Sequence, residues 1–278
     1  MQLSSSTYYS DPKQSRSERE EFEADVRGKI EQIRVEIPNA GYRMLLPLVK
    51  AQGIDIGERK LRQVISKFEL QIRPKRRFVK TTDSNHSHRV YPNLIEEMTL
   101  TGVNQVWASD ITYIRIENGF VYLAVILDLF SRKAVGWQVS KRIDGELVID
   151  ALKMAIARRR PPRGVIHHSD RGVQYLCDAY VKELRNNGFH ISCSAKGNPY
   201  DNAWVESFMK TLKVNEVYMW EYKTYLDVID RVPYFIEEVY NKKRPHSSLG
   251  YLSPEEFEKR EAISYQEKST VSRSITKL

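Results

Sequence analysis

The strongest constraint on the fold lies between residues 106 and 140, where three strand-like runs follow one another with only short connections. The first run, VWASDITYIRI, ends before the turn sequence ENG; the second contains FVYLAVIL; the third is KAVGWQVS. Runs of this kind joined by short turns predict neighbouring antiparallel strands. Because the second run is almost wholly apolar, it suits a central strand that is buried on both faces.

The pattern changes after residue 144, where helical and strand-like segments alternate. GELVIDALKMAIARRR reads as a helix that ends before Pro161 and Pro162, and GVIHHS as a fourth strand. CDAYVKELRNNG is helical, FHISCSA is a fifth strand, and DNAWVESFMKTLKVNE and residues 223–240 are helices. Three antiparallel strands followed by alternating elements predict an α/β fold in which helices flank a mixed sheet.

The first 72 residues are predicted to be all helical. Residues 15–34 read as a polar helix exposed to solvent. GYRMLLPLVKAQG and GERKLRQVISKFEL each place apolar residues on one helical face, and the short Gly-flanked connection between them indicates a helix-turn-helix. Pro47 is expected to kink the first of these two helices unless it lies near the start.

A helix-turn-helix would place its second helix in a DNA major groove. The polar residues that would then face DNA are Glu58, Arg59, Lys60, Arg62, Gln63 and Lys67. An ordinary helical hairpin with a polar outer face explains the same pattern. The sequence alone leaves both interpretations open.

The excess of positive over negative charge is concentrated in the amino-terminal third of the chain. The first 92 residues hold 18 of the 44 Lys and Arg residues but only 12 of the 36 acidic ones. Residues 73–93 have no apolar periodicity and suggest an exposed linker whose cations follow DNA phosphates. These cations are Arg73, Lys75, Arg76, Arg77 and Lys80. The expected organisation is a polar helix and linker (1–36), a helix-turn-helix (37–72), a basic linker (73–94), a core with carboxy-terminal helices (95–262) and a tail (263–278).

Bulk composition narrows the possible partners. A net charge of +8 favours a polyanion such as nucleic acid. No apolar run approaches the roughly 20 residues of a membrane-spanning helix. Two cysteines, Cys177 and Cys193, are too few for a disulfide framework, so a reducing, cytoplasmic location is expected.

Three acidic residues stand at corresponding places in different elements. Asp110 lies on the first predicted strand, Asp170 just past the fourth, and Glu206 in the first turns of a helix for which Asp201–Asn202 offers an N-cap. Carboxylates that converge in this way suit hard divalent cations such as Mg²⁺. Two such ions can activate an attacking oxygen and stabilise a leaving oxygen in phosphodiester chemistry.

Two lysines share the helical spacing of the third acid. Glu206, Lys210 and Lys213 fall at i, i+4 and i+7, which places a carboxylate and two phosphate-binding amines on one helical face. An exposed Glu–Lys pair of no functional meaning has the same spacing. A zinc site made of His168, Cys177, His190 and Cys193 matches no usual ligand spacing and is disfavoured.

These motifs resemble a known family. VWASDITYI, YLAVILDLFSRKAVGW, HHSDRGVQY, SAKGNPYDNAWVESFMKTLK and YNKKRPHSSLGYLSPEEF are together similar to the DDE-type transposases of bacterial insertion sequences, which have a retroviral-integrase-like core. The chain looks like the downstream-frame product of the branch that is encoded by two overlapping reading frames. The resemblance is strong over about residues 95–260, and the segment 37–90 is similar to the helix-turn-helix of that branch.

The resemblance implies a ribonuclease H-like core that cuts DNA at the ends of an insertion sequence and joins the exposed 3′-hydroxyl to target DNA. The acidic triad of the family falls on Asp110, Asp170 and Glu206, and 35 residues separate the last two, as is typical. These residues would hold two Mg²⁺ ions, for which Mn²⁺ could substitute. Lys213 matches the basic residue of the family. The other implied DNA contacts are Lys210, Asn198, Tyr200, Asn202 and Trp204.

The implied partners are the terminal inverted repeats, target DNA, further copies of the chain on paired DNA ends, and the product of the upstream reading frame. The His/Cys zinc module of retroviral relatives has no match here, so no zinc requirement carries over. Two alternatives remain open: a nuclease that cuts without joining, and a DNA-binding regulator whose core is not used for catalysis.

Overall fold

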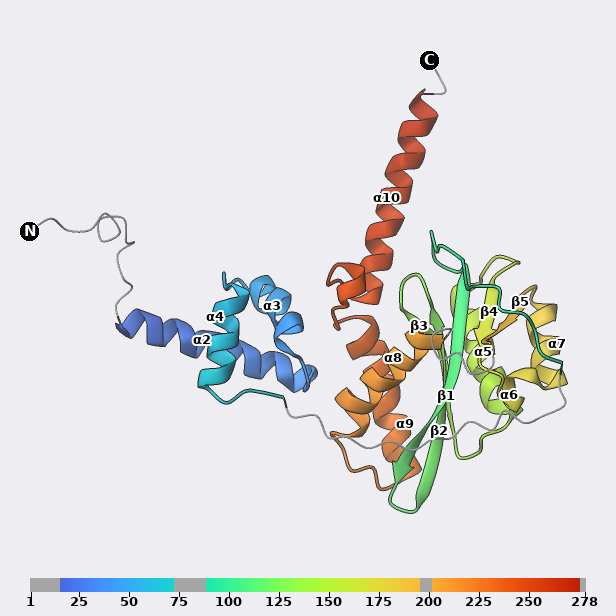
Figure 1. Ribbon diagram of the computed structural model, residues 1–278, viewed down its shortest axis with the longest axis horizontal. Helices are drawn as coiled ribbons and strands as arrows, with labels where there is room; N and C mark the ends of the chain where they lie inside the picture. The colour runs from blue at the N-terminus through green and yellow to red at the C-terminus, as the bar shows by residue number, and fades with distance from the viewer. Residues whose placement is uncertain (1–15, 73–88, 196–201, 276–278) are drawn as a thin grey trace, which may run out of the picture. The chain divides into compact units, whose positions relative to one another are not determined.

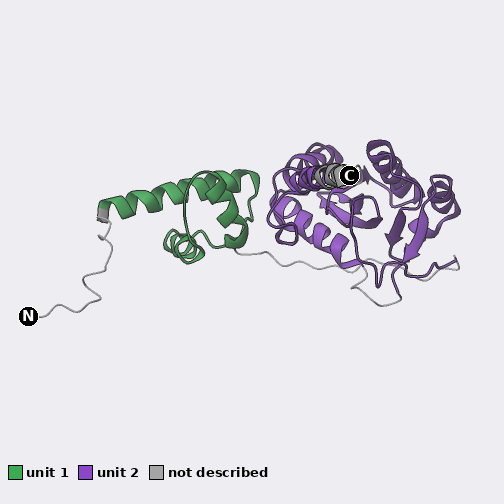
Figure 2. Cartoon of the chain, turned by 90° about the horizontal axis from the view of Figure 1, so that it is seen from above, with its two compact units in different colours: residues 1–73 green, residues 74–278 purple. Residues whose placement is uncertain are grey.

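The protein has two units, residues 1–73 and 74–278, which Figure 2 colours separately. The computed structural model describes residues 16–72, 89–195 and 202–275, with side chains from Ser17 onward and, in the last helix, up to Ser264. Its elements confirm the predicted class, because helices precede a mixed sheet that is itself flanked by helices (Figure 1).

The described part of the first unit, residues 16–72, contains three helices: α2 (Arg16–Glu36), α3 (Tyr42–Ala51) and α4 (Glu58–Lys67). The two helices expected from the apolar periodicity are present, and α3 continues through Pro47. The expectation of a wholly solvated first helix is wrong, because α2 packs on α3 and α4 and buries one face. That face consists of Val26, Ile30 and Ile33, whose helical spacing is hidden among many charged residues.

Glu23 connects α2 to α4. Its buried carboxylate accepts hydrogen bonds from the Lys60 amine at 2.5 Å and the Lys67 amine at 2.6 Å. These two hydrogen bonds lower the pKa of Glu23 to about 2, although its burial opposes the shift. Lys60 and Lys67 therefore stabilise the helical unit, a role that the helix-turn-helix interpretation did not foresee.

Replacing Glu23 by Gln should lower the free energy of unfolding of this unit by roughly 1–3 kcal/mol, because two charge-assisted hydrogen bonds are lost. Since the folded-state pKa is depressed, the stabilisation is present above about pH 4.5 and is lost as the pH falls toward 2. Thermal denaturation monitored by circular dichroism between pH 2 and 7 would measure both effects. The control is Glu31→Gln, which removes an exposed pair with Arg27. If both variants behaved alike, the buried contact would have no special role.

The second unit is built on a five-stranded sheet with the order β3-β2-β1-β4-β5. Strands β1 (Val106–Ile116), β2 (Gly119–Asp128) and β3 (Ala134–Ser140) form an antiparallel meander. Strands β4 (Ile166–Ser169) and β5 (His190–Cys193) extend the sheet parallel to β1. All five strands were predicted from the sequence.

Helices cover both faces of the sheet. One face carries α5 (Gly145–Arg159), the short α6 (Val173–Leu176) and α7 (Asp178–Asn186), and the other carries α8 (Ala203–Leu212) and α9 (Tyr225–Tyr234) (Figure 1). Trp107 of β1, Ile126 of β2 and Leu152 of α5 lie in the core between the sheet and α5. Gly136 permits this helix to approach β3 closely, since an added Cβ would lie 2.3 Å from the Ala151 carbonyl oxygen.

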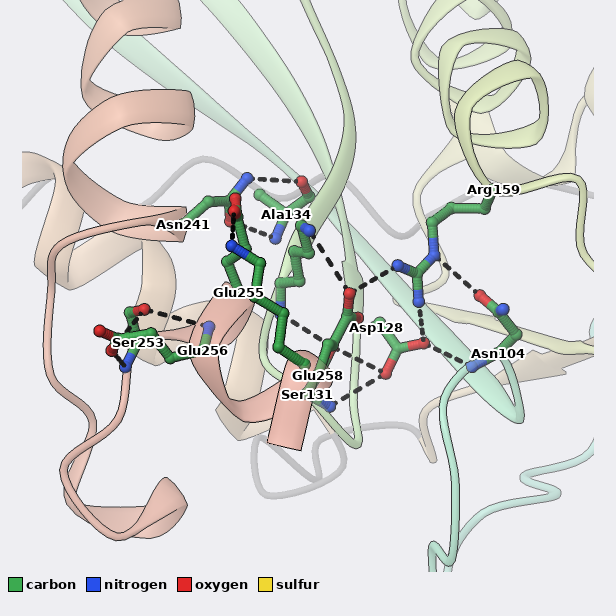
Figure 3. Close-up of polar contacts among 12 residues, drawn as sticks. Asn104, Asp128, Ser131, Ala134, Arg159, Asn241, Ser253, Glu255, Glu256 and Glu258 are labelled. Carbon is green, nitrogen blue, oxygen red and sulfur yellow. Dashed lines mark hydrogen bonds and ion pairs between the residues drawn. The ribbon is translucent and has the colours of Figure 1, made fainter. Parts of the chain in front are cut away.

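The last helix, α10 (Pro254–Ile275), is tied to the sheet through a buried ionic network (Figure 3). Asp128, at the end of β2, is fully buried and accepts hydrogen bonds from the backbone amides of Asn104, Phe130 and Ser131. The Arg159 guanidinium lies 3.7 Å from Asp128 and 2.8 Å from Glu258 of α10. One arginine therefore joins β2, α5 and α10.

Asn241 attaches the carboxy-terminal helices to the outer edge of the sheet. This residue ends the π-helical segment Phe235–Asn241, which continues α9. Its side chain accepts a hydrogen bond from the Ala134 amide at 2.9 Å and donates one to the Ala134 carbonyl at 3.0 Å, both drawn in Figure 3. After this anchor, α10 runs across residue 262, where the sequence suggested the start of a tail. Within the described ranges, the structure contains no helix that combines the length and the apolar character of a membrane span.

Candidate active site

Two of the three predicted acids are brought together by the pairing of β1 with β4. The parallel register places Ser109 opposite Ser169; Asp110 follows within β1, and Asp170 follows just past the end of β4. Paired residues of parallel strands point to the same face of the sheet. The carboxyl end of β4 therefore sets Asp170 beside Asp110 at the point where the ladder ends.

Each of these carboxylates is oriented by a backbone amide. Asp110 Oδ1 accepts a hydrogen bond from the Ile111 amide at 2.8 Å, and Asp170 Oδ1 accepts one from the Gly172 amide at 2.9 Å. Both side chains are half-buried. Such bonds restrict the rotamers of the two acids.

The third acid is positioned by a contact at the start of α8. Asn202 precedes this helix and is buried, and its side-chain amide donates to the Ser109 carbonyl at 3.5 Å. Asn202 occupies the predicted N-cap position, but its side chain makes no capping hydrogen bond; Asp201 lies outside the described residues. The contact with Ser109 instead holds the beginning of α8 next to β1, and Glu206 stands exposed in the first turn.

The electrostatics of Asp110 reflect this arrangement. Burial, together with the negative charges of Asp170 and Glu206, raises its pKa to about 7, while the Ile111 amide and Lys213 oppose the rise. The three acids are therefore within electrostatic range of one another. An ionised Asp110 is unfavourable in such surroundings unless a cation is nearby.

The three carboxylates do not yet form a ligand set. Within the described part of the chain, no three His, Cys, Asp or Glu side chains are grouped closely enough to hold a metal ion. The donor set is nevertheless chemically suited to a hard divalent ion, because it consists of carboxylate oxygens.

Lys213 approaches the acids from the end of α8. Its amine lies 4.9 Å from the centre of the Tyr113 ring, and partial burial lowers its pKa while Asp110 opposes the shift. Lys210 is exposed on the same helix. Trp204 is 40% exposed, and the Arg132 guanidinium lies 5.1 Å from its ring centre. Tyr113 and Arg132 were not singled out in the sequence, where nothing shows that distant segments meet.

A buried polar layer lies behind the acids. His167 Nε2 is 2.8 Å from the Tyr180 hydroxyl and 3.2 Å from the Ser109 hydroxyl. Burial lowers the pKa of His167 to about 3, so the ring is neutral at physiological pH. The only signal for this layer in the sequence was a histidine three residues before Asp170, which alternation along β4 turns inward.

The predicted DNA-contacting residues are only partly described by the structure. Arg59, Arg62 and Gln63 lie exposed on α4, where Arg62 also stacks over the Tyr42 ring at 5.0 Å. The remaining predicted contacts fall outside the described residues: Arg73, Lys75, Arg76, Arg77, Lys80, Asn198 and Tyr200.

Comparison with known proteins adds independent observations. The integrase core domain family matches residues 101–199 and again residues 187–254. An uncharacterized 31 kDa protein of insertion element IS600 from Shigella sonnei is 36% identical over 92% of this chain and 94% of its own length. The transposase InsF of insertion sequence IS3A from Escherichia coli is 40% identical over 78% of this chain and 76% of its own length. Among solved structures, the catalytic core domain of BIV integrase matches with a TM-score of 0.44 and 20% identity, over 58% of this chain and 99% of that one.

Proposed function

Because the chain belongs to the insertion-sequence transposases with an integrase core domain, we propose that Asp110, Asp170 and Glu206 form its catalytic centre. The protein is a DNA transposase, and its ribonuclease H-like unit is a polynucleotidyl transferase. The proposal assigns the cutting and joining of strands at the insertion-sequence ends to these three carboxylates.

One observation carries the assignment: the parallel register of β1 and β4 sets Asp110 beside Asp170 at the end of the shared ladder. The raised pKa of Asp110, to which Glu206 contributes, supports including the third acid. A cluster of carboxylates at the end of parallel strands is costly for the fold alone. It is useful if a cation binds there.

We propose that the three acids hold two divalent ions, Mg²⁺ with Mn²⁺ as a substitute. When bound, such ions supply Lewis acidity to phosphodiester chemistry. The protein contributes rigid placement of the oxygens, through the amides of Ile111 and Gly172. Lys213 would bind a phosphate oxygen next to the acids, and exposed Lys210 and Trp204 would contact the same strand farther along.

The amino-terminal unit has a separate role in this proposal. Residues 37–72 bind the terminal inverted repeats as a helix-turn-helix, with Arg59, Arg62 and Gln63 directed at DNA. Residues 73–94 form a basic linker to the catalytic unit. The chain assembles with further copies on paired DNA ends, alone or with the product of the upstream reading frame.

The test is a joining assay with end-containing duplexes and a target plasmid, with and without Mg²⁺ and with and without the upstream-frame product. Metal-dependent cutting and transfer to the plasmid are expected. Cutting without transfer, under every combination, would favour a simple nuclease. Specific binding with neither reaction would favour a regulator.

Lys213→Ala should weaken binding of end DNA several-fold, because one phosphate contact is lost. The slope of log K against log salt concentration should become shallower by about 1. Fluorescence anisotropy at several salt concentrations measures both quantities. Lys153→Ala is the matched control, since Lys153 is exposed on α5, on the other face of the sheet. An unchanged salt slope for Lys213→Ala would contradict the contact.

A further inference from the structure

A cavity of about 460 Å³ lies between the tip of the β1–β2 hairpin and the segment that follows α8. Its walls include the aromatic side chains of Tyr113, Phe120, Trp220 and Tyr222. Phe120 and Trp220 are each 48% exposed, although they are large and apolar. Exposed aromatic side chains in a concave place indicate a binding site.

The Trp220 side of the cavity is held in place by an ion pair. The Arg231 guanidinium lies 3.6 Å from the centre of the Trp220 ring and is 2.7 Å from the buried carboxylate of Glu216. The Tyr222 hydroxyl donates to the same carboxylate at 2.7 Å. Because α9 supplies Arg231, the indole is supported from behind rather than carried on a loose loop.

The opposite side of the cavity is formed by the hairpin. The rings of Phe120 and Tyr113 pack edge to face with their centres 5.4 Å apart. The cavity is thus bordered by two supported aromatic surfaces. Flat apolar rings that already have one partner are well suited to receive a further planar group.

Lys213 connects this cavity to the acids. Its side chain lines the cavity, its amine lies over the Tyr113 ring, and its charge opposes the rise in the pKa of Asp110. Tyr113 is three residues beyond Asp110 on the same strand, a separation of about 10 Å. One nucleotide step or two would span the distance between a phosphate at the acids and a base in the cavity.

We propose that this cavity binds an unstacked nucleobase of the DNA strand whose phosphate lies at the acidic centre. The inference rests on the proposed function and deepens it. Aromatic side chains stack on any base. Arg115 and Lys213 would neutralise the flanking phosphates, and the carboxylates of Glu117 and Glu221, which also line the cavity, would accept hydrogen bonds from base amino groups.

The experiment removes single bases from the DNA and single rings from the protein. Duplexes carry one abasic site at each position near the cleaved end, or in the target. The parent chain and its variants Phe120→Ala and Trp220→Ala are compared for binding and for joining. Tyr234→Ala is the matched control, because Tyr234 is an aromatic residue 54% exposed on α9 that does not line the cavity. Thermal denaturation confirms that each variant is folded.

For the parent chain, removing the base at one position should weaken binding about tenfold, the scale of one base stacked on an aromatic ring. Phe120→Ala and Trp220→Ala should bind intact DNA more weakly than the parent chain does, by about the same factor. For these two variants, replacing the intact duplex by the abasic duplex should weaken binding little further. Tyr234→Ala should behave like the parent. An effect of abasic sites near the cleaved end would show that the base comes from the insertion-sequence end. An effect of abasic sites in the target would show that it comes from target DNA.

Base dependence that is equally large in Phe120→Ala and Trp220→Ala would overturn the proposal. So would base dependence at no position, or variants that change only the oligomeric state, which would indicate a protein partner for the cavity. A different result, namely that the parent chain joins no substrate, would contradict the proposed function. The binding measurements still test the cavity in that case.

Discussion

Replacing Asp110 by Asn is expected to abolish strand joining, by roughly a thousandfold or more, while the affinity for end DNA stays within about twofold of the parent value. The amide keeps the size and hydrogen-bonding shape of the carboxylate but cannot supply an anionic oxygen to a divalent ion. Joining and anisotropy assays at saturating Mg²⁺ measure the two quantities.

The same variant should be more stable than the parent in the absence of metal. The folded-state pKa of Asp110 is raised to about 7 from an ordinary value of 3.8, so its ionisation destabilises the fold progressively as the pH rises through this range. The melting temperature of Asp110→Asn should therefore exceed that of the parent by several degrees above pH 7 and match it below pH 4. Added Mg²⁺ should narrow the difference by stabilising the parent.

The matched control is Asp150→Asn, because Asp150 is exposed on α5. It should change neither joining nor melting temperature appreciably. Joining by Asp110→Asn at more than a few per cent of the parent rate would remove Asp110 from the catalytic centre. A stable variant that has also lost DNA binding would mean that the carboxylate acts in recognition.

Replacing Arg159 by Ala is expected to lower the free energy of unfolding of the catalytic unit by about 3–5 kcal/mol, or its melting temperature by roughly 10 °C. The change leaves Asp128 buried without its guanidinium partner. It also removes the closest cation of Glu258. Burial alone would raise the pKa of Glu258, but Arg159 and Lys133 hold it below its ordinary value.

Arg158→Ala tests whether this loss of unfolding free energy is specific to Arg159. The neighbouring Arg158 forms a more exposed pair with Glu237, so its removal should cost less than about 1 kcal/mol. Since the folded-state pKa of Glu258 is depressed, the deficit of Arg159→Ala should be largest near neutral pH and smaller as the pH falls below about 4.5. Equal melting temperatures for the two variants would show that the network in Figure 3 contributes little.

The fold of the catalytic unit was predictable because its strands are defined by local patterns. Apolar runs, turns and helix stops gave all five strands, and the position of an acid at the end of β4 indicated that it would meet Asp110. Periodicity in α2 was harder to recognise, because three apolar residues are spread among long charged side chains. Asn202 stands at the N-cap as expected, but its side-chain amide donates to the Ser109 carbonyl and makes no capping hydrogen bond, which local sequence does not indicate.

The rest of the site depends on contacts between segments far apart in sequence. Nothing local indicates that Lys60 and Lys67 meet Glu23, or that Trp220 is supported by Arg231. A basic residue on a predicted recognition helix looks the same whether it faces DNA or a carboxylate of a neighbouring helix. Only the packing of α2 on α4 distinguishes the two cases.

The double hydrogen bond of Asn241 to Ala134 has a consequence for solubility. An outer strand with open amide and carbonyl groups invites pairing with a strand of another molecule, which leads to aggregation. At Ala134 the carboxamide takes the place of that foreign strand and occupies both groups at the beginning of β3. One side chain of the protein therefore blocks this route to fibre-like stacking at the beginning of the edge strand.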